Sequence, residues 1–221
     1  MTKRISYLLT GALVLLAIAG AANAQVQIVT SNSAVTWDDA ISWGSIPDGT
    51  GLNTPYSVTS TGGINTTVTN DAGFTAYTQS TSWSGCFNPG DGLLFNNFSD
   101  NPVTFSFGAG VYAVGTQVQT NDWVSYTAYL SAYDSSNNLL ASYSVNGVAN
   151  DNADGSAAFI GILSTDPNIS QVVISATTGS GGFAVNSVLL QTQAAPVPEP
   201  GSLLALTTGI GTLAFFIRKR K

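Results

Sequence analysis

Short runs in which apolar and polar residues alternate recur along the chain between Gln25 and Thr192, and no segment there has the period of a helix. Residues 103–107 and 126–133 alternate most strictly, so each run has one apolar and one polar face, as a half-buried strand does. Residues 134–138 have a turn composition, and 139–145 returns as the partner strand. Turn residues punctuate the runs about every 8–12 residues, which is typical of all-β sandwiches. The sequence therefore predicts a single antiparallel β-sandwich domain over residues 25–192.

The strand predictions follow from alternation and from β-branched and aromatic content. The run 158–163 is apolar throughout, which predicts a strand buried on both faces. The predicted strands span 26–30, 35–37, 56–59, 66–69, 74–77, 92–95, 103–107, 111–119, 125–133, 139–145, 158–163, 171–176 and 183–190.

Residues 1–24 have the organisation of a secretory signal peptide. Lys3 and Arg4 supply the positive n-region, residues 8–19 the apolar core, and Ala22-Asn23-Ala24 a small-x-small cleavage site. We therefore expect an N-terminal signal helix that directs the chain to the secretion translocon, with signal peptidase cutting after Ala24. An uncleaved anchor is the alternative, although the apolar run is short and the cleavage site well formed.

Residues 198–221 contain three parts in order, which are Pro198-Glu199-Pro200, an apolar run over 203–217 and the basic tail Arg218-Lys219-Arg220-Lys221. A bilayer span needs roughly 20 apolar residues, with about 17 as the short limit. Residues 201–217 just reach that limit, so a C-terminal transmembrane helix is predicted. The basic tail would act as the membrane stop on the cytoplasmic side, because basic flanks resist translocation.

This C-terminal organisation resembles the PEP-CTERM sorting signal of Gram-negative bacteria that make exopolysaccharide, and it matches at Pro198, Glu199 and Pro200. The resemblance implies recognition by an exosortase, a membrane-embedded cysteine transpeptidase. It also implies that the inner membrane holds the chain transiently before release or transfer to the cell surface or extracellular space. Residues 193–197 are expected to form a short linker to this signal. A plain tail anchor after a Pro-rich linker is the alternative.

All six Lys and Arg residues lie in the two terminal segments, so residues 25–197 contain 11 Asp and no Lys, Arg, His or Glu. No nucleic-acid partner is expected, because neutralising phosphates requires Lys or Arg. Without His and Lys, the Ser-His-Asp, Cys-His and Ser-Lys nucleophile systems cannot be built. Histidine-based zinc sites are excluded as well. We therefore expect no catalytic residue and no enzyme, a facing pair of aspartates being the one arrangement left open.

Residues 150–155 read Asn-Asp-Asn-Ala-Asp-Gly and alternate acidic and amide side chains, as calcium loops do, but no Glu closes them. Asp-rich turns usually bond their own backbone. We expect a solvated turn and no cofactor, with calcium as the alternative. Cys86 is the single cysteine; a partly buried small side chain is expected there, and an intermolecular bridge or a free thiol is the alternative.

Tryptophan rings either fill cores or stack on sugar rings. Trp43 and Trp83 are expected to be structural. Trp37 and Trp123 are the candidate glycan contacts, Trp123 because it follows Asp122 near the start of a strand. Two coplanar exposed aromatic rings would favour a glycan site, and four buried rings a structural role.

Several segments also resemble a family of secreted bacterial proteins of unknown function that often end in the same sorting signal. The resemblance implies a jelly-roll-like sandwich, akin to galactose-binding-like and other carbohydrate-binding domains, and no catalytic residue is implied. The matching segments are 39–43, 83–87, 90–94, 111–119, 133–134, 159–161 and 183–188.

The sequence thus predicts an exported, C-terminally sorted, non-catalytic protein with a structural or interaction role at the cell surface or in an extracellular matrix. The alternative is a carbohydrate-binding module of an exopolysaccharide matrix, assisted by calcium.

Overall fold

The computed structural model describes residues 25–99, 101–177 and 181–194. Apart from one 3-10 helix, η1 (Asn32–Ala34), the regular elements of these residues are strands, so the all-β prediction is confirmed. Their bounds are β1 Val26–Val29, β2 Asp39–Ile41, β3 Gly51–Leu52, β4 Tyr56–Thr59, β5 Asn65–Thr69, β6 Phe74–Thr78, β7 Gly92–Phe95, β8 Val103–Val111, β9 Ala113–Thr120, β10 Ser125–Tyr133, β11 Leu139–Val148, β12 Ala158–Ser164, β13 Ile169–Ala176, β14 Phe183–Val185 and β15 Val188–Gln191.

Over the described residues, no helix has the length and apolar character needed to cross a bilayer. The predicted signal helix (1–24) and transmembrane helix lie outside the described residues.

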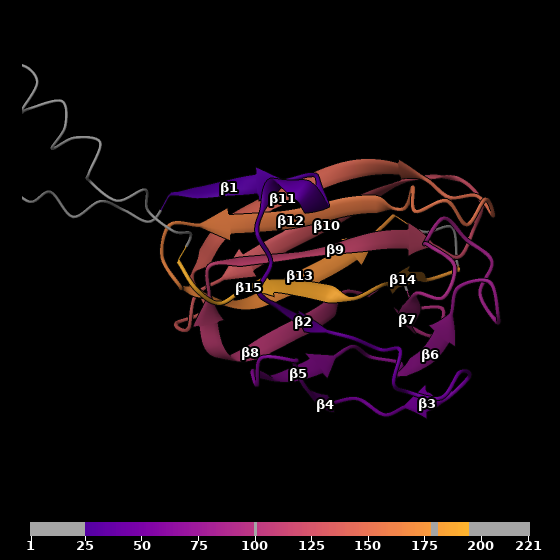
Figure 1. The fold of residues 1–221 in the computed structure, drawn as a ribbon, viewed down its shortest axis with the longest axis horizontal. Coiled ribbons are helices and arrows are strands. Elements are labelled where there is room, and N and C mark those ends of the chain that lie inside the picture. The colour runs from indigo at the N-terminus through magenta and orange to yellow at the C-terminus, as the bar shows by residue number, and fades with distance from the viewer. Residues whose placement is uncertain (1–24, 100, 178–180, 195–221) are drawn as a thin grey trace, which may run out of the picture.

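The strands form two antiparallel sheets that pack face to face (Figure 1). The nine-stranded sheet has the order β1-β12-β9-β14-β7-β6-β3, with β15 pairing with β9 and β2 beside this path. The six-stranded sheet has the order β11-β10-β13-β8-β5-β4. The strand β11 is thus an edge of one sheet and β1 an edge of the other. The finer, jelly-roll-like classification stays a prediction.

The core lies between the two sheets because each sheet turns one apolar face inward. In β10 the side chains of Ala128 and Leu130 are fully buried, while Tyr129 between them is exposed. Across the core, Ile160 and Ile162 of β12 are fully buried as well. The period-two alternation of the sequence is therefore the pattern of burial, and it orients both sheets.

The predicted single strand over 183–190 is divided in two, and the side chain of Asn186 explains the break. Its Oδ1 accepts a hydrogen bond from the backbone N–H of Gln117 (3.0 Å), and its Nδ2 donates to Gln117 Oε1 (2.8 Å). Both β14 and β15 pair with β9, on either side of this contact. An asparagine side chain thus replaces a strand residue in the ladder.

The prediction of a strand over 35–37 is wrong. Ser31 caps η1 by accepting from the N–H of Ser33, and Trp37 donates from Nε1 to the carbonyl of Asn32 (2.8 Å), so this stretch bends. The strand forms further along, as β2, where residues 39–41 pair with β15. The short strand β3 was not predicted, and the predicted strand over 111–119 divides at Tyr112, with β8 ending at Val111 and β9 beginning at Ala113.

Both ends of the described domain lie at one end of the sandwich (Figure 1). The backbone N–H of Gln25 donates to Thr165 Oγ1 (3.0 Å). At the C-terminal end of the described domain, the N–H groups of Thr192 and Gln193 donate to the carboxylate of Asp38 (2.7 and 3.0 Å). Gln25 and Ala194 line the same hollow, of about 430 Å³.

Candidate ligand groove

Two of the four tryptophans are buried, as predicted. Trp43 is 1% exposed, and its Nε1 donates to the carbonyl of Asn186 (2.9 Å). Trp83 is 5% exposed and packs against Phe95, with ring centroids 5.2 Å apart. These two rings have structural roles.

The two candidate glycan contacts differ in exposure and lie far apart. Trp123 is 61% exposed, whereas Trp37 is half-buried against Phe159, with ring centroids 6.1 Å apart. Trp37 packs over Gly115 of β9, and Trp123 lies in the loop beyond Thr120, at the end of β9. Five residues of strand separate Gly115 from Thr120, a length of about 17 Å. The two rings do not form one stacking platform.

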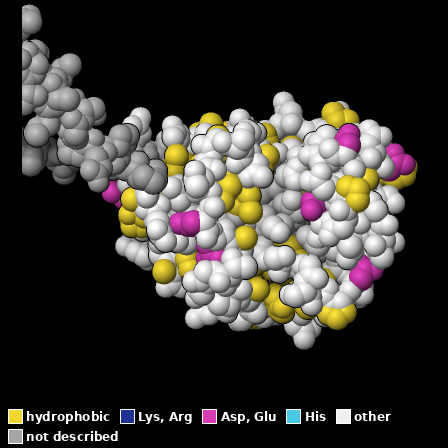
Figure 2. Space-filling view, viewed as in Figure 1, with side chains coloured by type: hydrophobic (Ala, Val, Ile, Leu, Met, Phe, Trp, Pro, Cys, Tyr) yellow, Lys and Arg dark blue, Asp and Glu magenta, His cyan; other side chains and the backbone are white. Residues whose placement is uncertain are grey.

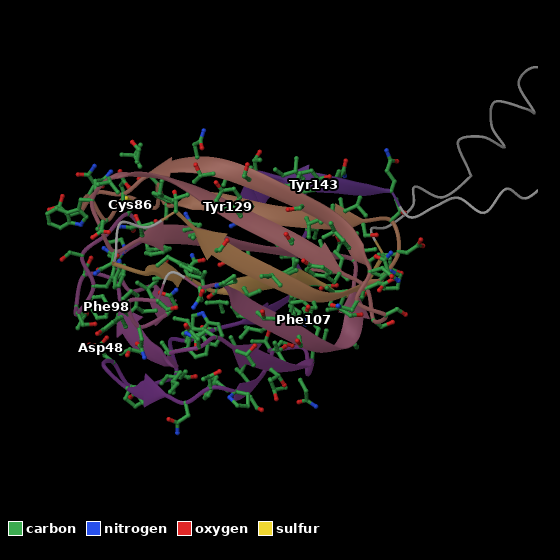
Figure 3. The ribbon with its side chains drawn as sticks, turned by 180° about the vertical axis from the view of Figure 1, so that it is seen from behind. Asp48, Cys86, Phe98, Phe107, Tyr129 and Tyr143 are labelled. Atoms are coloured by element: carbon green, nitrogen blue, oxygen red, sulfur yellow. The ribbon has the colours of Figure 1, made fainter. Side chains whose placement is uncertain are left out.

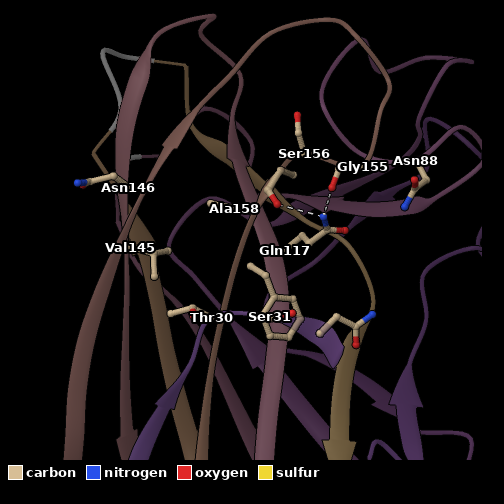
Figure 4. A pocket seen from close by; sticks show the side chains of 12 residues that line it. Thr30, Ser31, Asn88, Gln117, Val145, Asn146, Gly155, Ser156 and Ala158 are labelled. Carbon is tan, nitrogen blue, oxygen red and sulfur yellow. Dashed lines mark hydrogen bonds between the residues drawn. The ribbon is translucent and has the colours of Figure 1, made fainter. Parts of the chain in front are cut away.

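Two adjoining hollows open between β11 and the start of β12. The first has a volume of about 570 Å³ (Figure 4) and the second about 660 Å³. They share Asn146, Ser156 and Ala158, and we refer to them together as the β11–β12 groove. The first is lined by Thr30, Ser31, Asn32, Asn88, Gln117, Val145, Asn146, Gly155, Ser156, Ala157, Ala158 and Phe159, and the second by Ser125, Tyr126, Thr127, Asn146, Gly147, Val148, Asn150, Ser156, Ala158 and Thr177.

Every residue that lines the groove has an uncharged side chain. Amides and hydroxyls predominate and no aspartate is among them, although Asp154 adjoins the groove by accepting a hydrogen bond from the N–H of Ser156 (3.0 Å). Figure 2 shows aspartate side chains scattered singly over one face of the molecule, with no cationic side chain among the described atoms. The groove is therefore a neutral polar surface on an anionic domain.

Gln117 is the most firmly held side chain of the groove. Its Nε2 donates to the carbonyls of Gly155 (2.7 Å) and Ala157 (3.0 Å), bonds that Figure 4 draws as dashed lines. Its Oε1 accepts from Asn186, which also breaks the ladder beside it. These bonds hold the loop before β12 against β9, so the first hollow is a preformed feature.

Both candidate tryptophans adjoin the groove without lining it. Trp37 contacts Phe159 and Asn32, two residues of the first hollow. Trp123 comes two residues before Ser125, which lines the second hollow. Trp37 and Trp123 therefore adjoin different hollows of the same groove. Sequence reasoning missed Gln117, Asn146 and Ser156, which carry no motif.

Further exposed apolar side chains lie in or beside the loops at the end of the sandwich that holds Trp123. Phe98 is 64% exposed and Val148 is 61% exposed, and Figure 3 shows Phe98 at the loop end. The carbonyl of Val124 accepts from the N–H of Ala149 (2.9 Å), so the loop that holds Trp123 lies beside the end of β11.

In the segment 150–155, the acidic and amide side chains bond the local backbone. Asn150 Oδ1 accepts from the N–H of Asn152 (2.8 Å), and Asp154 Oδ1 from the N–H of Ser156 (3.0 Å). The hydrogen bond from Ser156 lowers the pKa of Asp154. Three or more His, Cys, Asp or Glu residues do not gather anywhere in the described ranges in a way that could hold a metal.

Cys86 is fully buried, and its thiol is next to this segment. Its Sγ accepts from the N–H of Asn150 (3.1 Å), and its own N–H donates to Gln119 Oε1 (2.6 Å). The small side chain expected there is thus fully rather than partly buried. The other predicted site residues, Ala22, Ala24, Pro198, Glu199, Pro200, Arg218, Lys219, Arg220 and Lys221, lie outside the described residues.

No family model and no curated protein matches this chain. Among solved structures, it is similar to CsCBM6-3 from Clostridium stercorarium in complex with cellobiose, with 11% identity and a TM-score of 0.33 over 57% of this chain and 86% of that one. It is also similar to a DUF4465 family protein from Bacteroides caccae ATCC 43185, with 12% identity and a TM-score of 0.27 over 75% of this chain and 100% of that one. Likenesses this low carry no argument about function. The fold and the groove lining define the class of this protein, which is an antiparallel β-sandwich with an uncharged, polar surface groove.

Proposed function

We propose that this chain is an exported, non-catalytic protein of the cell surface or extracellular matrix, and that its β-sandwich has a structural or interaction role. Signal peptidase would release the N-terminus at Ala24. An exosortase-type transpeptidase would then read Pro198-Glu199-Pro200 while the inner membrane holds the C-terminal segment. The sandwich is of the jelly-roll-like kind in this proposal.

The observation that supports display at a surface is the position of the two ends of the described domain. Gln25 and Ala194 line one hollow, which also contacts Leu163 near the end of β12. Phe159, near the start of β12, lines the groove. Four residues of strand between them correspond to about 14 Å. A domain held through either end would therefore direct its groove away from the point of attachment.

The non-catalytic role is supported by the chemistry of the described domain. It has no Lys, Arg, His or Glu side chain, and no aspartate lines the groove. General acid–base catalysis needs a titratable group within reach of the reacting atoms. Tyr126 is the titratable side chain that lines the groove, and its hydroxyl is occupied by the carbonyl of Val118 and the N–H of Ala158.

Intact mass spectrometry of the protein recovered from its source cells tests this proposal. The expected mature chain begins at Gln25 and lacks residues 201–221. Replacing Pro198, Glu199 and Pro200 by alanine should leave residues 201–221 attached, whereas the control substitution Gln193→Ala should be trimmed normally. Extracellular protein that retains residues 201–221 would refute the sorting step.

The second candidate is a carbohydrate-binding module, and the uncharged, amide-lined groove favours it. Ligand sites in proteins typically have volumes of about 300–1,000 Å³, and each hollow falls within that range. Calcium would assist binding only through residues 150–155, whose two ends Asn150 and Gly155 line the groove, or through aspartates elsewhere.

A further inference from the structure

The β11–β12 groove has the dimensions of a site for a chain-like ligand. Asn146, Ser156 and Ala158 contact both hollows, so a ligand lying in one reaches the other without leaving the surface. Together the hollows extend from Asn32 after β1 to Ser125 at the start of β10.

Electrostatics restrict the charge of that ligand. Residues 25–197 hold 11 Asp and no cationic side chain, so an anionic ligand is repelled by the whole domain. No aspartate lines the groove, so a cationic ligand has no carboxylate to pair with there. The field of the domain thus disfavours an anion, and although it draws cations to the surface, the groove lining has no charged group that would select one, so its polar, uncharged lining best matches an uncharged ligand.

The groove side chains match a ligand that is rich in hydroxyl groups. Amides and hydroxyls both donate and accept hydrogen bonds, as sugar hydroxyls do. Asn146 Oδ1 accepts from Thr127 Oγ1 (2.9 Å), and among the described residues its amide N–H groups have no protein partner. Both residues lie on the groove, and Asn146 is exposed.

We propose that the β11–β12 groove binds an uncharged oligosaccharide chain, with Asn146 and Ser156 at its centre and Trp123 beside its outer end. This rests on the interaction role under Proposed function and names its ligand class. Gln117 keeps the first hollow open and positions the loop before β12. A neutral peptide is disfavoured, because the groove offers no deep apolar pocket for a side-chain anchor.

The test uses the processed protein purified from its source cells and isothermal titration calorimetry at about 0.15 M salt, where charges are screened beyond roughly 8 Å. The uncharged probes are cellohexaose, xylohexaose and mannohexaose. The acidic probes are hexagalacturonate and hexaguluronate, and a Gly/Ser hexapeptide represents neutral peptides. We expect at least one uncharged oligosaccharide to bind, and the acidic ones and the peptide to bind at least tenfold more weakly.

Two matched pairs of variants locate the site. Asn146→Ala removes one ligand hydrogen bond and should weaken binding about three- to tenfold. Asn65→Ala is its control, because Asn65 is also exposed and its Oδ1 also accepts from a threonine hydroxyl (2.9 Å), but on β5 outside the groove. Ser156→Trp should fill the groove and abolish binding, while Ser57→Trp, on the exposed face of β4, should not. Thermal melts check that each variant is folded.

The proposal is overturned if no uncharged probe binds, if the acidic probes or the peptide bind as tightly, or if Asn65→Ala weakens binding as much as Asn146→Ala. A processed protein that binds none of these probes would leave the export and sorting proposal standing. A protein that binds cellohexaose but keeps residues 201–221 would support the groove proposal and refute the sorting step.

Discussion

The hydroxyl of Tyr126 in β10 donates a hydrogen bond to the backbone carbonyl of Val118 in β9 and so ties the six-stranded sheet to the nine-stranded sheet. The same hydroxyl accepts from the N–H of Ala158 (3.2 Å). Ala158 and Val118 are the last partners in the β9–β12 register, so a side chain from the opposite sheet bridges the two strands where their ladder ends. Ala158 lines both hollows, and the bridge therefore holds the groove in shape.

Removing this hydroxyl should destabilise the domain. Tyr126→Phe leaves a buried carbonyl and a backbone N–H without their partner, so we expect the free energy of unfolding to fall by about 1–3 kcal/mol. Urea unfolding followed by circular dichroism measures this. Tyr129→Phe is the control, because Tyr129 lies on the same strand with its side chain exposed, and its effect should be near zero. Equal stability of the two variants would contradict the bridge.

Alkaline pH should reduce the stability that the Tyr126 hydroxyl contributes. Burial raises the pKa of Tyr126 to about 12, whereas a tyrosine in an unfolded chain titrates near 10. Between these values the unfolded chain releases a proton that the folded domain keeps. The stabilisation is therefore fully present below about pH 10 and is lost as the pH rises toward about 12. Urea midpoints over this range should fall less steeply for Tyr126→Phe than for the natural chain.

Asp39 is a buried carboxylate held by four donors. It accepts from Ser60 Oγ, from Thr61 Oγ1 (2.8 Å), and from the N–H groups of Gly62 (2.5 Å) and Ala40 (2.7 Å). Burial raises the pKa of Asp39, but the hydrogen bonds together outweigh burial and hold it below the ordinary value.

We expect Asp39→Asn to lower the free energy of unfolding at neutral pH by about 1.5–3 kcal/mol, since an amide cannot accept all four bonds. The Asp39 contribution is present above the unfolded pKa of about 3.9 and is lost as the pH falls through the lower folded pKa. The gap in urea midpoint between Asp39→Asn and the natural chain should therefore close in acid. The control is Asp166→Asn at neutral pH, where Asp166 is exposed and the urea midpoint should change much less.

Position 85 requires glycine because the neighbouring side chains leave no room for a Cβ. A Cβ at this position would lie 2.5 Å from Gln119 Oε1 and 2.5 Å from Trp83 Nε1, and both side chains are buried. Gly85→Ala should therefore cost about 1–3 kcal/mol of stability through overpacking. At Gly44 the nearest atom to a new Cβ is Ser42 Oγ at 3.7 Å, so the thermal midpoint of Gly44→Ala should stay close to that of the natural chain. A stable Gly85→Ala domain would mean that this cluster is looser than described.

Trp123 should dominate the solvent-accessible fluorescence of the domain. Trp43 and Trp83 are buried and Trp37 is half-buried, while Trp123 is 61% exposed. Trp123→Phe is expected to remove the most steeply quenched component in an acrylamide titration and to shift the emission maximum to shorter wavelength. Trp37→Phe should change the quenching much less. The prediction fails if quenching by acrylamide is the same with and without Trp123.

The fold class was predictable because alternation is a local property. Strict alternation in 126–133 identifies both the strand and its buried face, and β10 follows it residue by residue. The error at 35–37 and the break at Asn186 arise from side chains that replace backbone contacts, which alternation does not record. In 158–163 the apolar run was interpreted correctly as a strand, but Phe159 and Leu163 are only half-buried, because the outer face of β12 has no covering sheet.

The groove was much harder to predict than the fold. Asn146 and Ser156 are ten residues apart and line the same hollows because β11, an edge of the six-stranded sheet, lies against β12 of the other sheet. Serine and asparagine are common at many exposed positions of this chain, so their type alone carries no signal. Trp123 could be singled out because a large ring beside a charged residue at a strand start is rarely core.

The two ends of the described domain lie close together, which has a mechanical consequence for a protein that holds a ligand in the groove. β15 ends at Gln191, close to Ala194, and pairs with residues 113–115 of β9, while Gln117, further along β9, lies in the groove. Tension between a bound ligand and the C-terminal end would run along β9. Antiparallel ladder bonds lie across the strand direction, so many of them would share the load at once instead of opening one after another. This arrangement favours resistance to a force applied along β9.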